Sequence, residues 1–192
     1  RSHRPGMWRE RLAVTGSIKF DIQFGDEVQA RGRALRQQLG QERPVWIAAS
    51  THQGEDEQVL AAFDRVLKAH PSALLILVPR HPERFDEVAQ LCASRGVRLR
   101  RRSQRAQCDD QDQVYLLDSM GELPRHYAAA DVAFVGGSLL PFGGHNVLEP
   151  AVLGVRVEDP SLDTAEMGPL ISAGHHATGS SFISDSTNVV IQ

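Results

Sequence analysis

The 192-residue sequence lacks the features that mark several classes of protein. Its two cysteines, Cys92 and Cys108, are too few for a metal quartet or a disulfide framework, so we expect a reducing compartment. No apolar run reaches the roughly 20 residues of a membrane span, and the basic, polar start at Arg1 is unlike a signal peptide. The formal net charge of -3 provides no basic excess for nucleic-acid binding. The composition therefore predicts a soluble chain, long enough for one domain with a real core.

Apolar runs of strand length alternate with amphipathic helical patterns from Pro44 onward. The runs lie at residues 45–49, 73–78, 97–100, 114–117 and 132–135. The uninterrupted aliphatic run at 73–78 is typical of a central strand that is buried on both faces, and the run at 97–100 is typical of an edge strand. This alternation predicts an α/β fold over residues 44–155, a Rossmann-like parallel sheet of about five strands with helices on both faces.

The two ends of the chain lack this regular alternation. Residues 1–43 combine scattered arginines with one helical pattern, which predicts an entry segment and linker. Residues 156–192 have sparse, unpatterned apolar side chains, which predict a divergent tail that buries little.

Residues 131–154 have the pattern of a strand, a glycine-rich loop and a helix. The loop has glycines at positions 136, 137, 143 and 144. These glycines would let a ligand approach the backbone, and the amides at the helix start would attract an anion such as a phosphate. Asn146 and Glu149 are three residues apart, so they project to one side of that helix start, where a carboxylate suits sugar hydroxyls. Glycines also serve plain turns at such junctions, so this loop alone is weak evidence.

Other polar loops follow the predicted strands at the edge where open parallel sheets bind ligands. The guanidinium of Arg80 is a fork that can hold two phosphate oxygens at once. Backbone groups at Met120 and Gly121 could bind the edge of a pyrimidine. The predicted nucleotide site comprises Pro79, Arg80, Met120, Gly121, Glu122, Asn146 and Glu149. Candidates for further contacts with the bound donor substrate are Ser50, Gly144 and His145. For Ser50, turn formation is an equally good interpretation.

Arginines and aspartates crowd residues 101–112. Such a charge run is typical of a solvated loop. Its acidic cluster has no supporting histidine, so we expect no bound metal.

Three stretches resemble one family, the 3-deoxy-D-manno-octulosonic acid (Kdo) transferases. The phrase Gly136-Gly-Ser-Leu-Leu-Pro-Phe-Gly-Gly-His-Asn-Val-Leu-Glu-Pro-Ala151 resembles the donor-site loop of these enzymes. The phrase Pro79-Arg-His-Pro-Glu-Arg84 is also similar, and Thr15-Gly-Ser-Ile-Lys-Phe-Asp21 resembles the link between the acceptor-binding and donor-binding halves. The resemblance covers roughly residues 12–155. It implies that the chain is the C-terminal donor-binding domain, one half of a GT-B glycosyltransferase in which two Rossmann-like domains face each other.

The resemblance implies an activity and a location. Kdo transferases move Kdo from CMP-Kdo onto lipid A precursors in lipopolysaccharide biosynthesis, at the cytoplasmic face of the bacterial inner membrane, with peripheral or anchored membrane association of the full-length enzyme. No cofactor or metal is expected. By resemblance, Arg80 neutralises the departing phosphate and Glu149 holds the ribose. The general base is expected in the N-terminal half, so this part alone should bind the donor but hardly catalyse transfer.

The resemblance ends after Val155. Residues 161–172 are instead weakly similar to a segment of aldehyde dehydrogenases, without a catalytic cysteine. Two alternatives to Kdo transfer remain open. One is another GT-B enzyme or a nucleotide-sugar epimerase that uses UDP, which tighter binding of UDP than of CMP would favour. The other is a non-catalytic nucleotide-binding module, which the missing half makes plausible.

Overall fold

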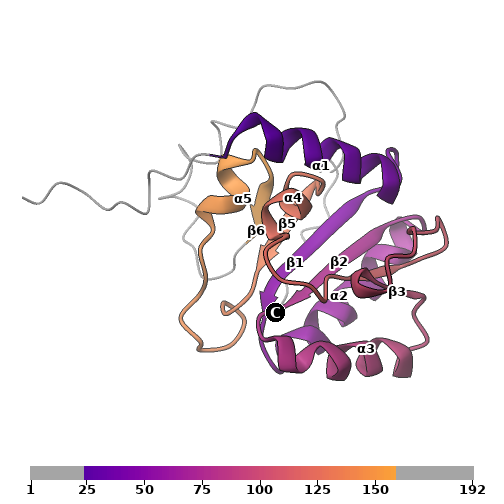
Figure 1. Cartoon of the computed structure of the whole chain (residues 1–192). Coiled ribbons are helices and arrows are strands. Elements are labelled where there is room, and N and C mark those ends of the chain that lie inside the picture. Colours follow the sequence, from indigo (N-terminus) through magenta and orange to yellow (C-terminus); the bar gives the residue numbers. More distant parts are fainter. Residues whose placement is uncertain (1–23, 159–192) are drawn as a thin grey trace, which may run out of the picture.

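The computed structural model of the chain describes residues 24–158 (Figure 1). Helices and strands alternate along the chain. In chain order the elements are α1 (Asp26–Leu39), β1 (Val45–Thr51), α2 (Glu55–Ala69), β2 (Leu74–Pro79), η3 (Pro82–Arg84), α3 (Phe85–Ser94), β3 (Leu99–Arg101), η4 (Arg102–Gln104), β4 (Val114–Leu116), α4 (Leu123–Tyr127), β5 (Val132–Val135), α5 (Leu148–Val152) and β6 (Arg156–Glu158). None of the helices in this part of the chain is long and apolar enough to cross a membrane.

The six strands form one parallel sheet in the order β3-β4-β2-β1-β5-β6. Ile47 of β1 lies beside Ile76 of β2 on one side and Ala133 of β5 on the other. Every residue of β2 is buried, as the aliphatic run predicted for a central strand, and β3 lies at an edge as expected. The prediction of a parallel α/β sheet is confirmed. β6 adds an edge strand from within the segment predicted as tail.

Helices cover both faces of the sheet (Figure 1). α1, α4 and α5 lie on one face, where Leu39 and Tyr127 pack against alternate residues of the strands. α2 and α3 lie on the other face, where Phe63 and Val88 pack against the intervening residues. Because strand side chains alternate between faces, the two helix layers bury both sides of every central strand.

α1 lies within the segment predicted as an entry segment and linker. Leu35 and Leu39 belong to the core on their side of the sheet. Arg36 pairs with Asp131 at 2.9 Å, just before β5. Gly32 faces Ala128 of the region after α4, where an added Cβ would lie 2.4 Å from the alanine Cβ. The compact unit therefore extends N-terminal to the predicted boundary at residue 44, because α1 supplies apolar side chains that the sheet needs.

The charged stretch after β3 differs from the solvated loop that its charges predict. Asp112 is only 5% exposed, and its carboxylate accepts hydrogen bonds from Arg100 Nε at 2.9 Å and the Asp109 amide at 2.7 Å. Burial raises the pKa of Asp112, but these hydrogen bonds outweigh burial and lower its pKa overall. The buried Arg43 donates to the Ser72 carbonyl at 2.7 Å and the Asp109 carbonyl at 3.2 Å. The charged side chains of Arg43, Arg100 and Asp112 therefore attach the segment before β4 to the rest of the fold.

Candidate functional site

The strand order reverses at β1. From β1 the chain adds β2 on one side, passes to β3 at the far edge, inserts β4 between β3 and β2, and then returns to place β5 on the other side of β1. Such a switch point opens a crevice between the two loops that leave the adjacent strands, and open α/β sheets bind ligands there. The loops in question follow β1 (residues 52–54) and β5 (residues 136–147). The glycine-rich loop singled out in the sequence thus lies at the switch point.

Gly136 shows how closely these two loops approach each other. Its amide donates to the Ala49 carbonyl at 2.8 Å. A Cβ at this position would lie 2.3 Å from the carbonyl oxygen of Ser50, which is part of the backbone and cannot move aside as a flexible side chain would. Gly136 is therefore needed for the close contact between the loop after β5 and the end of β1, and not for space around a ligand.

A buried carboxylate joins the loops. Glu55 is 0% exposed and accepts hydrogen bonds from the Gly137 amide at 2.9 Å, the Leu139 amide at 3.1 Å and the His52 amide at 2.9 Å. Backbone donors of this kind compensate the desolvation of a buried charge. The amides of Gly137 and Leu139 therefore bind the protein's own anion, and they are not open to a phosphate.

Glu55 is not among the residues that the sequence predicted for the site. The spacing of three residues from His52 resembles a capping box, in which a glutamate bonds back to the amide three residues earlier. That signal could have located the contact with His52. The contacts with the glycine-rich loop could not be found in this way, because that loop is more than 80 residues away.

Two histidines, one from each loop, meet at the switch point. Nε2 of His52 lies 2.7 Å from Nε2 of His145, which comes from the glycine-rich loop. The half-exposed ring of Phe142 stacks on His52 with a centroid distance of 4.3 Å, and His81 contacts His52 edge to face at 5.5 Å. Burial lowers the pKa of His52 and of His145 below the usual 6.5, and the positive charge of Arg80 acts in the same direction. His145 was predicted as a donor contact, whereas His52 was not among the predicted site residues.

Asn146 and Glu149 lie side by side, as their spacing predicted. Asn146 Nδ2 donates to Glu149 Oε1 at 3.3 Å, and Asn146 Oδ1 accepts the Leu148 amide at 3.1 Å. Asn146 lies just before the N-cap residue Val147, and its side chain accepts the amide of Leu148, the first residue of the five-residue helix α5. The first amide of this helix is thus already bonded to the asparagine, which weakens the expectation of a phosphate seat at the helix start.

Arg80 follows β2 and is exposed. Its amide donates to the Thr51 carbonyl at 3.0 Å, which holds the loop after β2 against β1, and the adjoining Pro79 is buried in the sheet. Within residues 24–158 its guanidinium has no hydrogen bond or ion pair. Arg84 of the same loop differs, since it pairs with the buried Asp56 at 2.6 Å. Arg80 is thus the arginine of this loop whose fork is available to a ligand.

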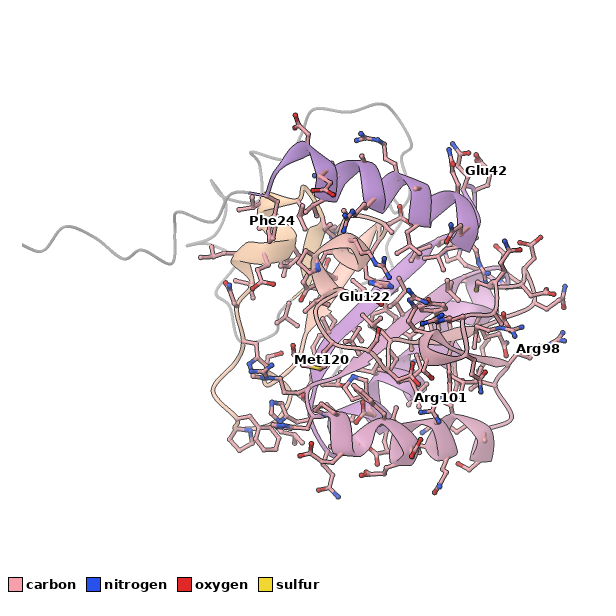
Figure 2. All side chains as sticks on the ribbon, in the orientation of Figure 1. Phe24, Glu42, Arg98, Arg101, Met120 and Glu122 are labelled. Atoms are coloured by element: carbon pink, nitrogen blue, oxygen red, sulfur yellow. The ribbon has the colours of Figure 1, made fainter. Side chains whose placement is uncertain are left out.

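The loop after β4 supplies the remaining predicted residues. Figure 2 shows Met120 near the carboxyl ends of the strands, and its side chain is 66% exposed. Gly121 has a positive φ of 79°, which favours glycine. The Glu122 carboxylate accepts from Ser119 Oγ at 2.7 Å and Arg102 Nε at 3.0 Å. Burial raises the pKa of Glu122, but these bonds outweigh burial and lower it overall. In this arrangement Glu122 holds its own loop in place, while Met120 and Gly121 lie open.

The comparisons with known proteins agree on one family. No protein-family model matches the chain. The chain is 49% identical over 145 residues to the 3-deoxy-D-manno-octulosonic acid transferase of Haemophilus influenzae, and 42% identical over 149 residues to that of Bordetella pertussis. These matches cover 76% and 75% of the chain but 34% of each relative, so the chain spans about a third of the length of the curated relatives it matches.

A solved structure covers the same region. The crystal structure of the C-terminal CMP-Kdo binding domain of WaaA from Acinetobacter baumannii matches with a TM-score of 0.67 and 42% identity. The match covers 76% of this chain and 77% of that domain. Residues 1–23 and 159–192, which hold the predicted interdomain link and the stretch similar to aldehyde dehydrogenases, lie outside the described residues. With this identity over most of a single solved domain, the chain belongs to the 3-deoxy-D-manno-octulosonic acid transferase family and corresponds to its C-terminal domain.

Proposed function

We propose that this chain binds CMP-Kdo as the donor-binding half of a GT-B glycosyltransferase. In the complete enzyme it would present the donor for transfer of Kdo to a lipid A precursor in lipopolysaccharide biosynthesis. The observation that carries the proposal is the likeness, at 42% identity, to a domain described as binding CMP-Kdo. Arg80, Asn146 and Glu149 follow strands β2 and β5 at the carboxyl edge of the sheet, where open α/β sheets bind ligands, and this supports the proposal.

The proposed roles follow from the chemistry of each side chain. Arg80 presents an exposed guanidinium fork, which suits the donor phosphate and stabilises its charge as CMP leaves. Glu149, oriented by Asn146, accepts hydrogen bonds from the ribose hydroxyls. Met120 and Gly121 offer backbone groups to the cytosine edge. Together these groups fix the donor, and no cofactor or metal has a part in the proposal.

Catalysis would need the other half of the enzyme. We place the general base and the contacts with the lipid acceptor there, together with association with the cytoplasmic face of the inner membrane. The chain alone would therefore bind CMP-Kdo and transfer Kdo hardly at all.

Calorimetric titration of the whole chain with CMP, in the presence of a chelator, tests the proposal. Arg80→Ala should weaken the binding of CMP and of inorganic phosphate by roughly 1.5–3 kcal/mol, the range for hydrogen bonds to charged groups. Glu149→Gln should weaken CMP more than phosphate, because it alters the proposed ribose contact and leaves the proposed phosphate contact of Arg80 unchanged. Arg33→Ala and Glu57→Gln, at exposed positions of α1 and α2, are the matched controls.

Two outcomes would contradict the proposal. CMP affinity that neither Arg80→Ala nor Glu149→Gln changes would remove the site from these residues. Tighter binding of UDP than of CMP would instead favour an enzyme that uses a different nucleotide sugar.

A further inference from the structure

The contact between His52 and His145 has the geometry of a shared hydrogen bond. The two Nε2 atoms are 2.7 Å apart and the ring centroids are 4.9 Å apart, with an interplanar angle of 12°. The centroid separation is close to the sum of the N–N distance and the two ring radii. The rings therefore meet end to end in nearly one plane, as an in-line N–H···N bond requires, and do not lie one above the other.

This geometry limits the pair to one hydrogen between its two Nε2 atoms. One imidazole donates through Nε2–H and the other accepts through its Nε2 lone pair, so the accepting ring, when neutral, carries its hydrogen on Nδ1. A hydrogen on both Nε2 atoms would force the rings apart. While the two rings are in contact, only one of the two histidines can donate a hydrogen bond through Nε2.

The surroundings hold the pair in place and make it attractive to an anion. The Glu55 carboxylate accepts the amides of His52 and Gly137, and a Cβ added to Gly137 would lie 3.2 Å from the His145 ring. The charged and titratable groups that act on the pair are Arg80, Arg84, His81 and Glu55. Glu55 is the one carboxylate among them, and backbone amides occupy its oxygens.

We propose that His52 and His145 form an anion-binding pair in the donor site: when donor binds, the Nε2 atoms separate and both donate a hydrogen to an anionic oxygen group of the nucleotide sugar. The second Nε2–H comes from solvent, or from Nδ1 of the same ring by a change of tautomer, so hydrogens are conserved. The inference rests on the proposed function, because a CMP-linked sugar acid carries two such groups, a phosphate and a carboxylate. Arg80 alone cannot hold both groups if they lie apart.

Nitrogen NMR of the histidine rings tests the pair without altering it. In the free chain we expect one of the two rings to carry hydrogen on Nε2 and its partner to accept. At saturation with the recognised ligand, both rings should carry hydrogen on Nε2. CMP offers only the phosphate, free Kdo offers only the carboxylate, and cytidine offers neither, so the ligand that changes the signals identifies the group. Unchanged signals with both bound CMP and bound Kdo would overturn the proposal.

Substitutions give an independent measure. His145→Ala should lower affinity for the recognised ligand about tenfold or more, and His145→Gln, which keeps an N–H near the position of Nε2, should recover part of it. His70→Gln, at the far end of α2, is the matched control. Thermal unfolding of each variant shows whether the fold is kept, and the NMR result on the unaltered chain stands if a variant does not fold.

The two proposals fail in different ways. A folded unaltered chain that binds neither CMP nor Kdo contradicts the proposed function. An unaltered chain that binds them, with folded His52→Gln and His145→Ala variants that bind equally well, leaves the proposed function intact and reduces the histidine pair to a contact between loops.

Discussion

At the scale of single residues, some charged side chains near the site are bonded within the fold and others are available to a ligand. The carboxylates of Glu55 and Glu122 are bonded within the fold, to amides in one case and to arginine and serine in the other. Arg84 pairs with Asp56, whereas Arg80 of the same loop has no partner among residues 24–158. The available groups therefore favour an anionic ligand at this edge of the sheet.

His126 provides a residue-scale prediction about pH. Its side chain is fully buried, Nδ1 lies 2.7 Å from the Glu122 carbonyl, and burial lowers its pKa from 6.5 to about 4. The folded state then binds fewer protons than the unfolded state between these two values. We expect the free energy of unfolding to fall by roughly 3 kcal/mol as pH drops from 6.5 to about 4. Urea denaturation at a series of pH values measures this.

The lowered pKa values of His52 and His145 add a change of the same sign, so a control is needed. His126→Asn keeps an N–H for the Glu122 carbonyl but does not titrate, and it should flatten the dependence on pH even though it lowers stability at pH 7. An equally steep loss of stability in this variant would assign the effect to other groups.

At the scale of elements, short helices present the loops and long helices build the core. α4 and α5 have five residues each, too few to be stable without tertiary contacts. α1 is longer and lies on the same face of the sheet as α4 and α5 (Figure 1). At Gly32 it comes so close that an added Cβ would meet Ala128, just after α4. The packing of α1 thus helps to hold α4 against the sheet.

Leu39 tests whether α1 is part of the folded unit. Its side chain is 2% exposed and lies in the core beneath the helix. Leu39→Ala should cost about 2–5 kcal/mol of unfolding free energy, the range for a buried leucine. Gln38→Ala, on the exposed face of the same helix, is the control. Urea denaturation that shows no difference between the two variants would mean that α1 acts as a linker.

At the scale of the whole molecule, the reversal of strand order at β1 determines where the site forms. β1 and β2 lie at the centre of the sheet, and the loops that leave β1, β2 and β5 meet at its carboxyl edge. The edges are formed by β3 and β6, each three residues long. A rigid centre with short edges keeps the loops fixed relative to one another.

Amide hydrogen exchange should reflect this arrangement. We expect the slowest exchange in β1 and β2, because their amides are buried and paired on both sides, and faster exchange in β3 and β6. Native-state exchange followed by NMR resolves the strands individually. Protection of β6 equal to that of β2 would contradict this expectation.

The alternation of strands and helices, and the neighbouring positions of Asn146 and Glu149, could be predicted from the sequence. The run at 73–78 became a fully buried central strand, because a continuous aliphatic stretch is stable only where both faces of the strand are covered. Asn146 and Glu149 came together because the chain turns into α5 between them, so a spacing of three residues brings their side chains to one side. These features depend on local periodicity, which is visible in the chain.

Which charges remain available depends on contacts between distant parts of the chain. His52 and His145 are 93 residues apart, and Glu55 reaches Gly137 across 82 residues, so no local pattern links them. The role of Gly136 likewise depends on the carbonyl of Ser50 on another strand. Strand order sets these contacts, because it places the loop after β5 beside the loop after β1, and side-chain chemistry then determines which groups pair within the fold and which remain open to a ligand.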